Sequence, residues 1–93
     1  MRDYELAFIL KPTLDEATIK GTTERIQSWI SERGGEVVSV TPVGHKRLAY
    51  PIAHQRDGYY VIVQFKARPD TVNEVERELR LTEDVMRYLI VRR

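Results

Sequence analysis

The chain has 93 residues, of which 42% are hydrophobic and 31% charged, a composition typical of one folded domain. It contains no cysteine, which excludes disulfide frameworks, thiol nucleophiles and cysteine-ligated zinc. The 15 basic and 14 acidic residues give a net charge of +1, so an anionic partner would meet local basic patches. No apolar run approaches the ~20 residues that cross a bilayer, and we expect a cytoplasmic protein.

The first third of the chain predicts a strand followed by a helix. In residues 4–10 large apolar residues alternate, which is the period of a strand lying on a core. Pro12 ends this strand, and Thr13 with Glu16 forms a capping-box pattern that predicts the start of the helix. The helix itself is indicated by apolar residues at a spacing near 3.6: Ile19, Ile26, Trp29 and Ile30. Gly34-Gly35 can adopt the left-handed geometry that ends it.

Residues 36–52 predict a strand that bends over 41–44 and resumes over 45–52. Pro42 and Pro51 lie within this extended segment. Because proline has no backbone N–H to donate to a neighbouring strand, both are tolerated only at a sheet edge or at a bulge. We therefore expect this segment to be an edge strand.

The second half predicts a turn, a strand, a helix and a last strand. Residues 53–58 contain the turn dipeptide Asp57-Gly58. Residues 59–66 alternate, with the apolar face expected in the core formed by Tyr59, Val61, Val63 and Phe65. Pro69-Asp70 opens the second helix, with the aspartate as the expected cap. Residues 86–91 alternate again and predict the last strand.

The expected order is strand, helix, strand, strand, helix, strand over residues 1–93. Two interleaved right-handed βαβ units of this kind give an α+β, ferredoxin-like split βαββαβ domain. Its four-stranded antiparallel sheet carries both helices on one face. The second strand lies at an edge in this topology, as its prolines require.

Residues that could carry chemistry are few. No carboxylate lies at a metal-ligand spacing from His45 or His54, so a surface position is the simpler interpretation of both histidines. Some small ferredoxin-like enzymes cleave acyl phosphates, but they need a glycine-rich anion loop after the first strand. Residues 10–13 contain no glycine. We therefore expect no enzyme, no metal and no cofactor.

A second reading of the same fold is the RNA-recognition motif, which presents stacking aromatic side chains from its third strand. Residues 57–65 superficially match the glycine-aromatic signature of that motif. The match would expose Tyr59 and bury Gln64, which inverts the apolar face. We therefore predict Tyr59 in the core and disfavour base stacking on the open face of the sheet.

The whole chain resembles the bacterial small-subunit (30S) ribosomal protein six family. The resemblance rests on Arg2-Asp3-Tyr4-Glu5, Pro12, Lys46-Arg47-Leu48-Ala49-Tyr50-Pro51-Ile52, Gly58-Tyr59 and Glu78-Leu79-Arg80. It implies the fold derived above and a structural role in the small ribosomal subunit. It also implies a heterodimer with small-subunit protein eighteen that binds the central domain of 16S ribosomal RNA.

The resemblance implies two sets of site residues. The partner protein is expected along the second strand, at His45, Lys46, Arg47, Leu48, Ala49, Tyr50 and Pro51. Ribosomal RNA is expected at Arg2, Tyr4, Arg80, Arg87 and Arg92. The alternatives are that Leu48 or Tyr50 packs in this protein's own core, and that each arginine is simply solvated. An alternative function is a small self-associating regulatory or ligand-binding ferredoxin-like module that uses the same edge.

Overall fold

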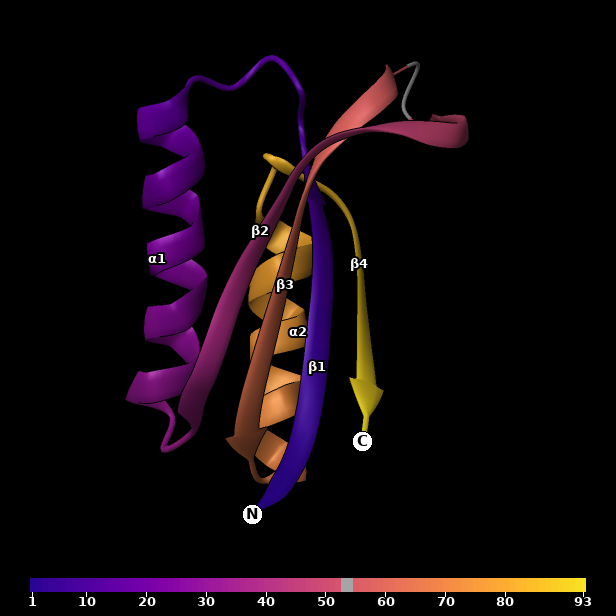
Figure 1. The fold of residues 1–93 in the computed structure, drawn as a ribbon. Coiled ribbons are helices and arrows are strands. Elements are labelled where there is room, and N and C mark those ends of the chain that lie inside the picture. The colour runs from indigo at the N-terminus through magenta and orange to yellow at the C-terminus, as the bar shows by residue number, and fades with distance from the viewer. Residues whose placement is uncertain (53–54) are drawn as a thin grey trace.

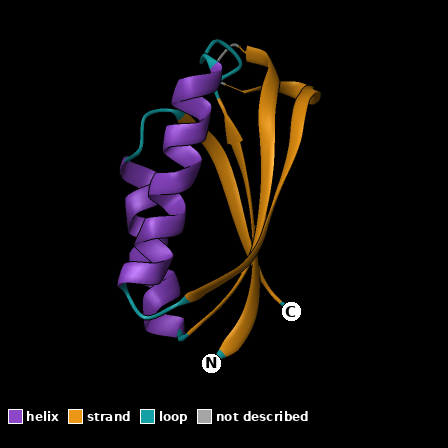
Figure 2. Cartoon of the chain, turned by 60° about the vertical axis from the view of Figure 1, so that its left-hand side comes forward, coloured by secondary structure: helices purple, strands orange, loops and turns teal. Residues whose placement is uncertain are grey.

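The computed structural model describes residues 1–52 and 55–93, with side chains described for residues 1–48 and 56–93. Its strands form one antiparallel sheet in the order β2-β3-β1-β4, and both helices cover the same face (Figures 1 and 2). The elements in chain order are β1 (Arg2–Leu10), α1 (Glu16–Glu32), β2 (Glu36–Ile52), β3 (Gln55–Ala67), α2 (Pro69–Leu81) and β4 (Val85–Arg92). The predicted ferredoxin-like fold is confirmed, with β2 at one edge.

The core lies between the sheet and the two helices, as the alternation of the strands predicted. Phe8 on β1 is opposite Val61 on β3 and Tyr88 on β4, so the three side chains share the helix-side face. Phe8 and Val61 are almost completely buried, and Tyr88 packs against them from the edge. Tyr59 is half-buried against the same core, which confirms its predicted face.

Both predicted helix caps are wrong. The N-cap of α1 is Asp15, whose carboxylate accepts a hydrogen bond of 2.7 Å from the backbone N–H of Thr18, whereas Thr13 lies in the preceding turn. Hydrogen bonds from Thr18 lower the pKa of Asp15 below its ordinary value of 3.8, because they stabilise the ionised form. At α2 the N-cap is Arg68, which makes no side-chain cap bond, and Asp70 lies in the first helical turn.

β2 is one long strand in which the predicted bend appears as bulges. Its register against β3 shifts between Val37 and Ser39 and again between Pro42 and Gly44. Gly44 has a φ of 102°, a left-handed geometry that favours glycine. The bulges allow Pro42 to lie in the strand without ending it.

The turn predicted over residues 53–58 is wrong for residues 55–58, including Asp57-Gly58, which lie inside β3, while residues 53–54 lie outside the described part of the chain. Gly58 pairs with Lys46 and Asp57 with Arg47. A Cβ at Gly58 would overlap Cγ2 of Ile9, so this glycine permits close packing between β3 and β1.

The outer parts of β2 and β3 form a projecting two-stranded arm. Pairing of β1 with β3 ends where Leu10 lies opposite Tyr59. Residues 46–52 of β2 and 55–58 of β3 continue beyond this point (Figure 1), and they pair at Lys46–Gly58, Arg47–Asp57 and Ile52–Gln55. We call these residues the β2–β3 arm. A two-stranded ribbon is marginally stable in water unless it packs on something else.

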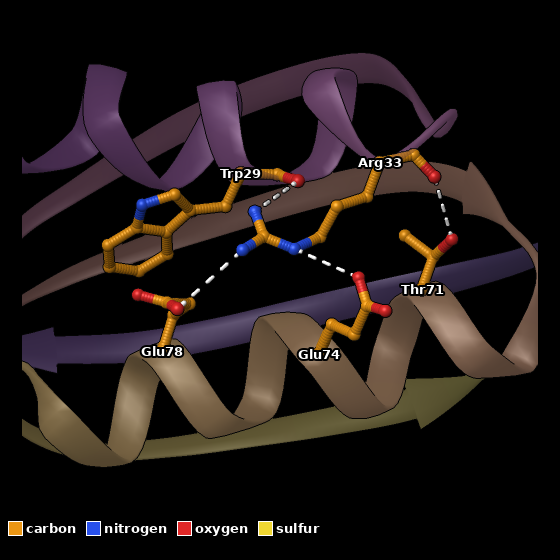
Figure 3. A network of polar contacts seen from close by, with 5 residues as sticks. All are labelled: Trp29, Arg33, Thr71, Glu74 and Glu78. Atoms are coloured by element: carbon orange, nitrogen blue, oxygen red, sulfur yellow. Dashed lines mark hydrogen bonds and ion pairs between the residues drawn. The ribbon is translucent and has the colours of Figure 1, made fainter.

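One polar network joins the two helices at the end of α1 (Figure 3). The Arg33 guanidinium lies 3.0 Å from a carboxylate oxygen of Glu74 and 3.6 Å from one of Glu78. It also donates to the carbonyl of Trp29 at 3.3 Å, and the Thr71 hydroxyl donates to the carbonyl of Arg33 at 2.9 Å. These contacts hold one flank of α1 against α2.

Candidate protein and RNA interfaces

The arm brings together the residues predicted to contact a partner protein. His45 lies at its base, where its ring meets that of Tyr59 edge-on with a centroid distance of 5.1 Å. Lys46 and Arg47 are exposed, and Arg47 lies opposite Asp57 across the arm. Because β2 is an outer strand, its free side offers backbone donors and acceptors for an added strand.

Leu48 and the next three residues complete the predicted surface. Leu48 is only 9% exposed, although it does not belong to the main core cluster. The backbone of Ala49, Tyr50 and Pro51 continues β2, but their side chains lie outside the described part of the structure. His54 lies outside it as well.

The arginines predicted to contact RNA form two groups along the β1–β4 side of the sheet. Arg92 lies opposite Tyr4 at the end of β4, which places it diagonally beside Arg2, and both side chains are exposed. At the other end of β4, Arg80 and Arg87 line one hollow of about 300 Å³ with Val85, Met86 and their neighbours, although Arg87, which lies opposite Ile9, belongs to the sheet face away from the helices. The Arg80 guanidinium also lies 3.6 Å from a carboxylate oxygen of Glu76, and the Arg80 side chain is 62% exposed.

Tyr4 has a different position from these arginines. Its residue is 8% exposed, and its ring stacks on that of Phe65 with centroids 5.6 Å apart. Position 4 shares the helix-side face with Leu6 and Phe8, so the ring belongs to the core. This burial argues against the predicted contact of Tyr4 with RNA.

The two predicted surfaces lie at opposite edges of the sheet. The partner residues follow β2, whereas Arg87 and Arg92 follow β4, with β3 and β1 between them. The two sets of predicted residues are therefore separated by the width of the sheet.

A groove between α1 and β2 was not predicted from the sequence. It has a volume of about 590 Å³ and an apolar floor, and its residues come from α1, the segment before it, β2 and β3. They include Leu14, Ile19, Val40, Pro42, Tyr59 and Val61 below and Glu16, Lys20, Thr23, Glu24, Gln27 and His45 at the rim. The available signal was Thr22-Thr23, where the helix carries threonines in place of larger apolar residues.

Within 1–52 and 55–93, no three histidine or carboxylate side chains are grouped so that they could hold a metal ion. No helix in those ranges is long and apolar enough to cross a membrane.

The fold and these surfaces define a small ferredoxin-like domain with a free edge strand on one side and exposed arginines around β4 on the other. The sequence profile of the family described as "Ribosomal protein S6" matches residues 3–92. The chain belongs to the ribosomal protein S6 family.

Relatives and solved structures agree with this assignment. The "Small ribosomal subunit protein bS6" of Caldanaerobacter subterraneus is 46% identical over 99% of this chain and 97% of its own length. The bS6 protein of Clostridium novyi is 44% identical over 98% and 96%. The crystal structure of 30S ribosomal protein S6 from Thermotoga maritima superposes with a TM-score of 0.95 at 30% identity, covering 99% of this chain and 87% of that one.

Proposed function

We propose that this protein is a structural component of the bacterial 30S ribosomal subunit, where it binds the central domain of 16S ribosomal RNA as a heterodimer with small-subunit protein eighteen. The observation that carries the proposal is membership of the ribosomal protein S6 family over residues 3–92. The relatives are small-subunit ribosomal proteins, a structural family without enzymatic activity. The protein acts within the ribosome, in the cytoplasm.

The arm and the free side of β2 support the position of the partner protein. A two-stranded ribbon gains stability when another surface covers it. An edge strand also provides main-chain hydrogen bonds to a strand laid beside it. His45, Lys46 and Arg47 are exposed where such a strand would pass.

The positions of four arginines support the position of the RNA. Arg2 and Arg92 lie near one end of β4, and Arg80 and Arg87 lie near the other. Residues 87 and 92 are roughly 17 Å apart along the strand at ~3.3 Å per residue, far enough to reach separate phosphates. A net charge of +1 is too small to hold RNA strongly by itself, so the partner supplies much of the affinity.

Binding to a central-domain fragment of 16S ribosomal RNA, with and without the partner, tests the proposal. We expect weak binding by this protein alone, tight binding by the heterodimer, and a steep loss of affinity as salt is raised. Arg92→Ala should weaken binding by the heterodimer. Arg25→Ala is the matched control, because Arg25 is an exposed arginine of α1 and is not among the residues predicted to contact RNA. Equal affinity with and without the partner would contradict the proposed heterodimer.

The alternative, a self-associating module, makes a different prediction in the same preparation. Gel filtration would then show a homodimer of this chain, and Lys46→Glu with Arg47→Glu would dissociate it. The ribosomal proposal predicts a monomer that shifts to a heterodimer when protein eighteen is added.

A further inference from the structure

The groove between α1 and β2 is lined in part by side chains too short to fill it, among them Thr23 and Pro42. The flank of α1 that forms its wall carries Glu16, Lys20, Thr23 and Gln27, which recur at i, i+4, i+7 and i+11 and so lie in one row. Thr23 is half-buried in this row and is too short to fill the space above the apolar floor.

The groove opens toward the β2 edge of the molecule. On a helical wheel, Trp29 and Arg33 lie on the opposite flank of α1, where Arg33 meets Glu74 of α2. The flank with Lys20 and Thr23 is therefore the one away from α2. Figure 1 agrees, since α1 lies beside the outer strand β2 and α2 lies behind the centre of the sheet.

A strand added along β2 would direct alternate side chains into this groove. Val40 and Pro42 lie opposite Val63 and Val61, so they belong to the helix-side face of the sheet. Because side chains alternate between the two faces of a strand, every second residue of an added strand points to that same face. There it meets the overhanging flank of α1.

We propose that this groove anchors one large apolar side chain from an extended segment of the partner protein, which pairs with β2 at the same time. The inference rests on the proposed function and adds a specificity site to it. The apolar floor selects Leu, Met or an aromatic side chain. The rim carries two carboxylates, Glu16 and Glu24, and one ammonium group, Lys20. This excess of negative charge favours a cationic residue beside the anchor.

The groove is continuous with the predicted partner surface through His45. His45 contributes to the rim and also begins the row of predicted partner residues on β2. A segment that follows β2 past His45 therefore contacts both places without changing direction. The interface then includes α1, which the sequence did not indicate.

The test is isothermal titration of purified small-subunit protein eighteen with the wild-type chain and two variants. Thr23→Phe fills the groove from the wall of α1. Ser28→Phe is the matched control, because Ser28 is exposed and lies outside the groove on the same helix. We expect Thr23→Phe to weaken binding by about tenfold or more, since the anchor can no longer be buried. Ser28→Phe should leave the affinity unchanged.

A second measurement uses the wild-type chain and does not depend on how a variant folds. On addition of the partner, the methyl resonances of Ile19, Val40 and Val61 should shift, because all three line the groove. The methyl resonances of Val75 in α2 should shift much less.

The outcomes separate the inference from the proposed function. If the wild-type chain does not bind protein eighteen, the proposed function fails and the groove inference fails with it. If the wild type binds, but Thr23→Phe binds equally well and the groove methyl groups do not shift, only the groove inference is overturned.

Discussion

Replacing Arg33 by methionine should remove most of the polar link between the two helices. Methionine replaces the apolar stem of the arginine side chain but has no charge and no donors. It deletes the contacts at 3.0 Å to Glu74 and 3.6 Å to Glu78, and the bond of 3.3 Å to the Trp29 carbonyl. The Thr71 bond uses the backbone carbonyl of Arg33 and should remain.

The size of the effect follows from the exposure of these groups. The Arg33 side chain is 27% exposed, while those of Glu74 and Glu78 are 52% and 35% exposed, so water screens both ion pairs and solvates the carboxylates left behind. Two pairs of this kind and one long hydrogen bond contribute together about 1–2 kcal/mol to the free energy of unfolding. In a domain of this size each kcal/mol lowers the Tm by about 4–8 °C.

The assay is urea unfolding followed by circular dichroism, with Arg77→Met as the control. Arg77 is an exposed arginine of α2, and its replacement should change the free energy of unfolding by less than about 0.5 kcal/mol. A double-mutant cycle of Arg33→Met with Glu74→Gln should give a coupling energy of about 0.5–1 kcal/mol. An Arg33→Met loss no larger than that of the control, together with zero coupling, would refute the assigned role of the network.

Three further predictions concern the core, the arm and the first helix. Phe8→Ala should cost about 3–5 kcal/mol in the free energy of unfolding by urea, because Phe8 is completely buried. Lys46→Glu with Arg47→Glu should weaken heterodimer assembly in a pull-down while costing at most about 1–2 kcal/mol of stability, mainly by placing Glu opposite Asp57; an unfolded double variant would show that the arm is core. Asp15→Ala should lower the Tm at neutral pH. The pKa of Asp15 is depressed, so its stabilisation is present above pH 3.8 and is lost as the pH falls through the lower folded-state value. The Tm difference between wild type and Asp15→Ala should therefore disappear in acid, and a difference that persists there would contradict the capping role.

The periodicity of the chain was enough to predict the strands and their buried faces. Large apolar residues alternate along β1 and β3, and the core observed in the structure uses the face that this alternation predicted. Local capping was harder to predict. Thr13 and Asp15 can both accept a backbone N–H, and the turn that follows Lys11 decides which of them lies at the helix end.

Backbone pairing overrode two local signals. Asp57-Gly58 is a strong turn dipeptide, yet β3 continues through it because Lys46 and Arg47 pair with it from β2. Pro42 and Gly44 predicted a bend, but a bulge absorbs both residues within one strand. Such pairing depends on a partner strand that is distant along the chain.

Some features of the candidate sites could likewise be predicted from the sequence, and others could not. The edge position of residues 45–51 could be predicted from the sequence. Pro51 has no backbone N–H, so it cannot donate the hydrogen bond that a central strand would need there. The proximity of Arg2 to Arg92, and of residues 80 and 87 to the same hollow, could not, because it depends on how β4 aligns with β1 and α2. The burial of Tyr4 likewise depends on the helices that cover its face of the sheet.

By itself, then, the sequence determined the order of the elements, the faces of the strands and the edge that the prolines require, because these follow from local periodicity and backbone chemistry. Only the tertiary structure decided the projecting arm, the grouping of arginines around β4 and the groove beside α1. Each of these joins residues far apart along the chain, and their meeting depends on the strand register and on the packing of the helices.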